Sequence, residues 1–328
     1  MSLDNKIKTD VLEINEEQVV SKITSRLRDI LREDLHKRGY VIAMSGGIDS
    51  SVSAALCVEA LGPSKVYGLL LPERDSDPTS TKRGQLLATH LGIKYELQDI
   101  APTLEAIGCY KWRDEAIVST FPQYGDNWKS KIVIAGGVEG RFNHFMLVVQ
   151  DPDGEITEKR LGLKEYLQIV AATNYKQRIR KAIEYFHADR LNYAVVGTPN
   201  RLEYDQGFFV KNGDGSADIK PIAHLYKSQV YKLAKYLKLP QEIATATPTT
   251  DTYSMEQGQD EFYFALPYQK MDYALWAHNN NISTQDLAKY LRINNEQADW
   301  IYKDIETKRR TTAFLHAKPY LIENVLEV

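Results

Sequence analysis

The chain has 328 residues, of which 43% are hydrophobic and 26% are charged, as is typical of a globular protein with a substantial core. Its 41 Lys and Arg residues and 44 Asp and Glu residues give a formal net charge of −3, whereas a dedicated nucleic-acid binder usually has a strongly basic domain. No apolar run approaches the roughly 18 to 20 residues needed to cross a bilayer. An acidic N-terminus and only two cysteines, Cys57 and Cys109, favour a reducing compartment. We therefore expect a cytoplasmic enzyme without a nucleic-acid or membrane partner.

Helical and strand-like segments alternate along the first two thirds of the chain. Apolar residues recur at helical spacing from Val19 to Leu35, which predicts an amphipathic helix that ends near Gly39. Short apolar runs predict buried strands at residues 40–44, 65–71, 95–100 and 193–196, with helical segments between them. This alternation predicts an α/β fold in which a parallel β-sheet is flanked by helices on both faces.

The segment from about Asp126 to Leu163 interrupts this alternation. A glycine-rich stretch is followed by two β-prone runs, which flank the turn sequence Asp151-Pro152-Asp153-Gly154. We interpret residues 126–163 as a β-hairpin inserted into the core. From about Asp260 the pattern becomes helical, so we expect a single domain over residues 1–328 with a helical C-terminal region at 260–328.

A glycine-containing loop joins the first predicted strand to the following helix, with the sequence Ser45-Gly46-Gly47-Ile48-Asp49-Ser50-Ser51. The N–H groups and the positive dipole end of a helix N-terminus form an anion site, and the two glycines let phosphate oxygens approach the backbone. The hydroxyls of Ser45, Ser50 and Ser51 can donate to the same anion. Asp49 would repel a phosphate unless a cation bridged the two, which predicts a Mg²⁺ ligand. A turn that uses these residues only for geometry and capping is the simpler alternative.

This loop lacks the lysine of the P-loop and does not fit G-x-G-x-x-G, so a hydride-transfer enzyme on a Rossmann fingerprint is disfavoured. It resembles the pyrophosphate-binding loop of the ATP pyrophosphatase, or PP-loop, superfamily, whose adenylating enzymes share a Rossmann-like fold of the adenine nucleotide alpha hydrolase type. Six further motifs follow in the order and spacing of the NAD synthetase family and cover most of residues 40–275. They are Asn174–Arg180, Gly197–Glu203, Gly207–Asp214 with Ala217-Asp218, Pro221–Lys227, Pro248–Asp251 and Gly258–Glu261.

The resemblance implies ATP-dependent amidation of deamido-NAD⁺ to NAD⁺ with ammonia, through an adenylated nicotinate carboxylate, with release of AMP and pyrophosphate. It implies that Asp49 and Glu203 hold Mg²⁺ and act in catalysis together with Lys227. The implied ATP contacts are Ser45, Gly46, Gly47, Asp49, Ser50, Ser51, Leu71, Thr198, Lys227 and Thr249. The implied deamido-NAD⁺ contacts are Asn174, Arg178, Lys211, Asp214, Asp218 and Lys308.

Four positions depart from the pattern of the family. Leu70 replaces an arginine, for which Arg74 could substitute, while Val210, Asn212 and Thr307 replace Thr, Tyr and His. An amide ligase that uses the same core on another carboxylate, such as a sugar acid, therefore stays open. A non-catalytic nucleotide-binding paralogue is a further alternative. A tRNA-modifying relative is disfavoured by the acidic charge balance and the absence of cysteine pairs.

The resemblance also implies a homodimer, whose interface would include the helix from Val19 to Leu35. Only about 40 residues precede the loop, too few for the amidase domain of glutamine-dependent relatives. We therefore expect free ammonia, or ammonia delivered by a separate partner. Cys57 lies among apolar residues and is expected in the core. The scattered histidines give no reason to expect a transition-metal site.

Overall fold

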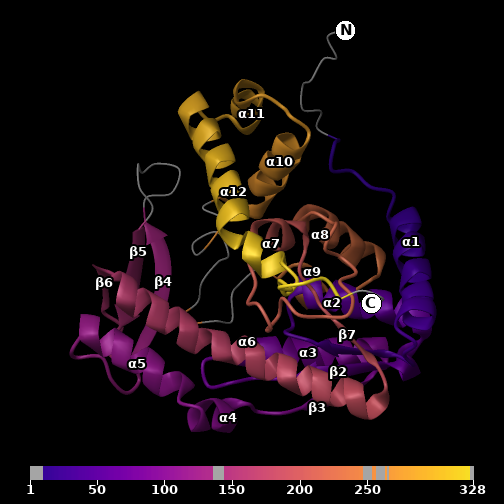
Figure 1. Cartoon of the computed structure of the whole chain (residues 1–328), viewed down its shortest axis with the longest axis horizontal. Helices are drawn as coiled ribbons and strands as arrows, with labels where there is room; N and C mark the ends of the chain where they lie inside the picture. The colour runs from indigo at the N-terminus through magenta and orange to yellow at the C-terminus, as the bar shows by residue number, and fades with distance from the viewer. Residues whose placement is uncertain (1–9, 136–143, 247–252, 256–262, 264–265, 326–328) are drawn as a thin grey trace.

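Four parallel strands form the central sheet of the computed structural model, in the order β3-β2-β1-β7 (Figure 1). The structure describes residues 10–135, 144–246, 253–255, 263 and 266–325. The strands are β1 (Tyr40–Ala43), β2 (Val66–Leu70), β3 (Lys94–Leu97) and β7 (Ala194–Val196), and all three neighbouring pairs are parallel. These are the four strands that the sequence predicts, each shorter by one or two residues, and β3 begins one residue before its predicted start.

Helices cover both faces of this sheet, which confirms the predicted α/β fold. Because successive side chains of a strand point to opposite faces, Tyr40 and Ile42 enter one apolar core while Val41 enters the other. The first face carries α1 (Glu16–Asp29), α2 (Ile48–Leu61), α3 (Pro78–Leu91), α8 (Lys227–Tyr236) and α9 (Gln241–Ala244). The second face carries α4 (Ala101–Ala106), α5 (Cys109–Thr120) and α6 (Leu163–Leu191).

Helix α1 is extended by a π-helical turn, Ile30–Asp34, and a 3₁₀ turn, Pro63–Lys65, leads into β2. The cores on the two faces contain Cys57 and Cys109, respectively, both as free thiols. Cys57 is fully buried, as expected of a core residue. None of the described helices is both long and apolar enough to span a lipid bilayer.

A second, antiparallel sheet lies beside α5 and the N-terminal part of α6 (Figure 1). Its strands are β4 (Lys129–Ala135), β5 (His144–Gln150) and β6 (Ile156–Arg160). The turn at Asp151–Gly154 joins β5 to β6, as the hairpin pattern predicts. The sheet has one strand more than the predicted hairpin, because β4 precedes the glycine-rich stretch and pairs with β5. Residues 136–143 of that stretch lie outside the described residues.

The C-terminal helices pack around an apolar core of their own. They are α10 (Tyr268–Asn279), α11 (Thr284–Leu291) and α12 (Asn295–His316), and α7 (Arg201–Gln206) joins this core through Leu202. Helix α12 has 22 residues and ends at His316. Its last turns thereby reach the carboxyl edge of the central sheet, where Thr311, Thr312 and Phe314 line a cavity.

Candidate active site

A cavity of about 850 Å³ opens at the carboxyl ends of β1, β2 and β7. Open α/β sheets place their ligand sites at this edge. The walls of the cavity come from all parts of the chain: the loop after β1, helices α3, α6, α7 and α12, and the ends of β4 and β5. Large, partly apolar cavities lined by a few converging polar groups are the usual form of a small-molecule site.

The loop after β1 has the geometry of an anion cradle. Gly46 has φ +76°, and a Cβ at this position would lie 2.3 Å from the carbonyl oxygen of Ser80, so only glycine fits. Gly47 precedes the first residue of α2. The hydroxyls of Ser50 and Ser51 donate to the carbonyl oxygen of Gly47 at 3.1 and 2.7 Å and so fix the first turn of the helix. The backbone N–H groups of that turn are therefore held at the cavity.

The three predicted catalytic side chains meet at one side of this loop. The ammonium group of Lys227, at the start of α8, donates to Oδ2 of Asp49. Asn200 connects Asp49 to Glu203, because its side-chain amide donates to Oδ1 of Asp49 at 3.1 Å and its backbone N–H donates to Oε2 of Glu203 at 3.1 Å. Asp49, Glu203 and Lys227 all line the cavity. Glu203 and Lys227 follow Asp49 by 154 and 178 positions in the sequence, and the structure brings all three together.

The charge of Lys227 is stabilised by its surroundings. Burial lowers the pKa of this 2%-exposed side chain, but the carboxylates of Asp49 and Glu203 outweigh burial and raise the pKa overall. The buried carboxylate of Asp272 accepts from the backbone N–H groups of Lys227 and Ser228 at 3.2 and 2.7 Å, which anchors α8 to α10. Burial raises the pKa of Asp272 to about 6. The Lys227 side chain thus lines the cavity with its charge favoured by Asp49 and Glu203.

Two arginines that the sequence interpretation did not assign also line the cavity. Arg83, on α3, packs against Gly46, and its Nε has no hydrogen-bond partner among the described residues. Nε of Arg180, on α6, donates to the carbonyl oxygen of Leu71 at 3.1 Å. Leu70 and Leu71 lie in the cavity wall at the end of β2. The sequence offered one signal for Arg83, namely a basic residue on the helix that follows β2.

Most residues expected to contact deamido-NAD⁺ line the same cavity. Asn174 and Arg178 come from α6, and Nε of Arg178 donates to the carbonyl oxygen of Lys211 at 3.3 Å. The ammonium group of Lys211 donates to the carbonyl oxygens of Phe314 at 2.8 Å and Ala317 at 3.4 Å, at the end of α12.

Asp214 and Lys308 also line the cavity. Oδ1 of Asp214 accepts from the backbone N–H of Val210 at 2.8 Å, and burial raises the pKa of Asp214. The ammonium group of Lys308 donates to Asp304 at 2.6 Å and to the carbonyl oxygen of Tyr263 at 2.6 Å. Burial is the largest influence on Lys308 and lowers its pKa.

The remaining predicted contacts are placed differently. Asp218 is not part of the cavity wall; its carboxylate accepts from the backbone N–H of Val195 in β7 at 2.7 Å and so holds its own segment beside the sheet. Thr198 lines the cavity, whereas the N-cap of α7 is Asn200, which forms a capping box with Glu203. That pattern, Asn followed three residues later by Glu, could have identified Asn200 from the sequence. Thr249 lies outside the described residues.

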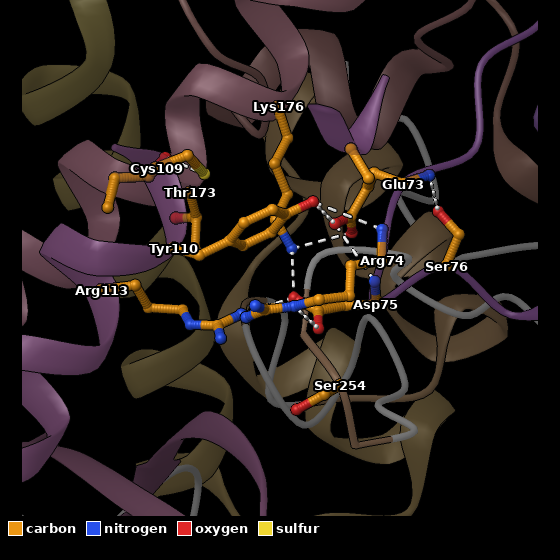
Figure 2. Close-up of polar contacts among 12 residues, drawn as sticks. Glu73, Arg74, Asp75, Ser76, Cys109, Tyr110, Arg113, Thr173, Lys176 and Ser254 are labelled. Carbon is orange, nitrogen blue, oxygen red and sulfur yellow. Dashed lines mark hydrogen bonds and ion pairs between the residues drawn. The ribbon is translucent and has the colours of Figure 1, made fainter. Parts of the chain in front are cut away.

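A buried ionic network fixes the loop that follows β2 (Figure 2). Figure 2 shows the ammonium group of Lys176 between two carboxylates, with Nζ 2.8 Å from Oε1 of Glu73 and 2.9 Å from Oδ2 of Asp75. Arg113 approaches Asp75 to 2.5 Å, and the hydroxyl of Tyr110 donates to Glu73 at 2.9 Å. Burial alone raises the pKa of Asp75, but Lys176 and Arg113 outweigh it, and the pKa is lowered overall.

Arg74 belongs to the outer side of this network. Its guanidinium lies 3.8 Å from the ring centre of Tyr110 and 3.7 Å from Asp114. Arg74 is not part of the wall of the main cavity. The arginines that face the cavity from this side are Arg83 and Arg180 instead.

The residues of the site are compatible with a magnesium ion. Asp49 and Glu203 offer carboxylate oxygens at the cavity wall, and Mg²⁺ is usually held by one or two carboxylates together with water and substrate phosphates. Among the described residues, no group of three or more His, Cys, Asp or Glu side chains could form a protein-only metal cage. A metal shared with a phosphate ligand fits this donor set.

Known proteins similar to this chain identify its family. A family model described as NAD synthase matches residues 19–132 and 148–312. The NH(3)-dependent NAD(+) synthetase of Rhizobium meliloti (strain 1021) is 54% identical over 320 residues, which cover 97% of this chain and 96% of that protein. The enzyme of the same name from Thermotoga neapolitana is 35% identical over 283 residues, which cover 84% of this chain and 91% of that protein.

Among solved structures, the NMN synthetase from Francisella tularensis aligns with a TM-score of 0.65 at 22% identity. The alignment covers 95% of this chain and 100% of that chain. At this level of identity the likeness shows a shared fold.

Proposed function

Because this chain belongs to the NAD synthase family, we propose that it converts deamido-NAD⁺, ATP and ammonia into NAD⁺, AMP and pyrophosphate. The observation that carries the proposal is the single cavity that joins the loop after β1 to the polar wall of α6. A nucleotide triphosphate and a long polar acid can therefore meet in one enclosed space. The loop after β1 and the polar residues of α6 lie far apart in the sequence.

In the first step, an oxygen of the nicotinate carboxylate attacks the α-phosphorus of ATP. The bond from that phosphorus to the bridging oxygen breaks, and pyrophosphate leaves with the bonding electrons. Negative charge gathers on the leaving group, and fixed cations at this position lower the barrier. We propose that Lys227 and Arg83, which both line the cavity, supply this charge. We propose that Asp49 and Glu203 hold Mg²⁺, which when bound would screen the phosphate charges.

In the second step, ammonia attacks the acyl carbon of the adenylate. The carbon–oxygen bond to AMP breaks, AMP leaves as the anion, and the nitrogen loses a proton to give the amide. The raised pKa of Lys227 keeps its side chain protonated, so we assign it an electrostatic role and not that of a base. Enclosure by the end of α12 would protect the adenylate from water.

The decisive experiment supplies the purified protein with ATP, Mg²⁺, ammonium and deamido-NAD⁺. We expect AMP, pyrophosphate and NAD⁺ in equal amounts, and glutamine should not replace ammonium. Nicotinate mononucleotide and a sugar acid serve as competing carboxylates in the same pyrophosphate-release assay. Release of ADP, or turnover confined to another acid, would exclude this function.

We also propose that the enzyme is a cytoplasmic homodimer. The apolar stripe of α1 is buried within the chain, and the exposed residues of this helix are polar. Six of the large exposed apolar side chains instead lie on α5 and α6: Trp112, Val118, Leu163, Leu167, Tyr175 and Phe186. A second copy of the chain is the partner that would cover them. Analytical ultracentrifugation should give twice the chain mass, and Leu167→Glu should shift the protein to monomer.

A further inference from the structure

Apolar side chains of β4 and β5 lie together on one face of the second sheet, but only some of them are used as core. Across β4 and β5, Ile132 pairs with Leu147 and Ile134 pairs with Phe145, so these four side chains lie on one face. Ile132 and Leu147 are almost completely buried against α5 and α6. Ile134 and Phe145 lie at the end of the same face, are only partly buried, and line the cavity.

The exposed end of this face is part of a rigid aromatic surface. The ring of Phe145 stacks on that of Tyr166 with the centres 4.0 Å apart and the planes 15° from parallel. Tyr253 is buried beside them and also lines the cavity. We call Ile134, Phe145, Tyr166 and Tyr253 the distal wall.

Hydrogen bonds hold the two sides of the distal wall together. The backbone N–H of Ser130 donates to the hydroxyl of Ser254 at 2.9 Å, and the N–H of Met255 donates to the carbonyl oxygen of Ser130 at 3.3 Å. Strand β4 therefore fixes the segment that carries Tyr253. A wall that is held in this way can select a ligand by shape.

The distal wall lies far from the phosphate loop along α6. Arg180 marks the carboxyl edge of the central sheet, because it binds the carbonyl oxygen of Leu71. Tyr166 lies 14 residues earlier in the same helix, which corresponds to about 21 Å at 1.5 Å per residue. The proposed acid contacts Asn174 and Arg178 lie between these two points.

We propose that the distal wall binds the ring of the dinucleotide acid that is remote from the reacting carboxylate, and that it thereby selects long acids over short ones. This inference depends on the proposed function. The carboxylate must reach the α-phosphate near Asp49, so the other end of a dinucleotide extends along α6. A planar base binds favourably against a fixed aromatic surface. The family model does not match residues 133–147, so Ile134 and Phe145 are additions of this chain to the family's common core.

The test measures the dissociation constant of deamido-NAD⁺ by calorimetry and the KM values by steady-state kinetics. Loss of one stacking ring weakens binding by about tenfold, so Phe145→Ala should raise the Kd and the KM for deamido-NAD⁺ by that order. The KM for ATP should change by less than about twofold. Phe145→Leu should show a smaller effect, and Ile134→Ala provides a second variant if Phe145→Ala does not fold.

Two controls make the test specific. Tyr236→Ala removes an exposed aromatic ring on α8 that is not part of the cavity wall, and it should leave all constants unchanged. Nicotinate mononucleotide lacks the remote ring, so its kcat/KM should be equal in wild type and Phe145→Ala. An unchanged Kd for deamido-NAD⁺ in the folded Phe145 and Ile134 variants would overturn the distal wall. Normal binding by the wild type without NAD⁺ formation would overturn the proposed function alone.

Discussion

Arg83 shows how a side chain that belongs to none of the sequence motifs can still line the cavity beside the loop after β1. It reaches the cavity from α3, packs on Gly46, and its Nε has no hydrogen-bond partner among the described residues. A guanidinium group matches the geometry of phosphate oxygens well. Leu70 cannot supply such a contact, although it lies at the same wall.

We predict that Arg83→Gln raises the KM for ATP by about tenfold, because one charge-assisted hydrogen bond contributes on the order of 1.5 to 3 kcal/mol. The KM for deamido-NAD⁺ should stay within about twofold. Lys82→Gln, at the exposed neighbouring position, is the matched control. Equal effects of the two substitutions would mean that only the net charge of α3 matters.

His187 couples the fold to pH. Arg190 donates to its Nδ1 at 2.7 Å, and because a guanidinium only donates, Nδ1 must carry a lone pair. Burial lowers the pKa of His187, and Arg190 adds to this against the opposing charge of Glu96. The neutral ring therefore stabilises the fold above pH 6.5, and this contribution is lost as the pH falls through the lowered pKa.

Urea unfolding of wild type and His187→Phe between pH 7.5 and 5.0 checks this expectation. The free energy of unfolding should fall more steeply with acidification in the wild type. His224, whose pKa burial also lowers, accounts for a part that both proteins share. Parallel curves would show that His187 does not titrate in this range.

At the scale of elements, the loop after β2 is held by a clamp between α5 and α6. Lys176 has a 1%-exposed side chain and contacts two carboxylates of this loop, Glu73 and Asp75. Removal of one partner from a buried ion pair leaves an uncompensated charge. The loop also forms a wall of the cavity through Pro72 and Ser76.

Lys176→Met should therefore lower the free energy of unfolding by about 3 to 5 kcal/mol, measured by urea titration. Lys164→Met, an exposed position on the same helix, should change it by less than about 0.5 kcal/mol. A double variant that also carries Asp75→Asn should recover part of the loss. No difference between the two single lysine variants would refute the clamp.

The elements that the sequence predicted well are those with a local signal. Strands β1, β2 and β7 are nearly all apolar, and the phosphate loop is one continuous segment. Helix α6 has no comparable local signal over its 29 residues. Its buried side chains include Lys176, Lys181 and Glu184, so its polar positions read as solvent-exposed. Contacts such as that of Asn200 with Asp49 exist only through tertiary structure and have no local signal.

At the scale of the whole molecule, the cavity lies where three structural units meet. The central sheet, the second sheet and the C-terminal helices each contribute to its walls. A ligand that binds there contacts all three units and therefore stabilises them together. Binding to the folded state alone adds about 2.7 kcal/mol when the ligand is a hundredfold above its Kd.

We predict that ATP with Mg²⁺ raises the melting temperature of the protein by several degrees in a thermal shift assay. Asp49→Ala should lose most of this shift. ADP without Mg²⁺ provides the comparison for the contribution of the nucleotide alone. An equal shift for wild type and Asp49→Ala would place the triphosphate elsewhere in the molecule.

The contact between Lys211 and the end of α12 has one more consequence. Its ammonium group already donates hydrogen bonds to the carbonyl oxygens of Phe314 and Ala317. An anionic ligand that bound Lys211 would compete with these two carbonyl oxygens. Ligand binding would then weaken the contact of Lys211 with the C-terminal segment, and that contact would weaken ligand binding by the same factor. Removal of the C-terminal residues from Phe314 onward would then raise the affinity of Lys211 for the anionic substrate, but it would also leave the cavity more open to solvent.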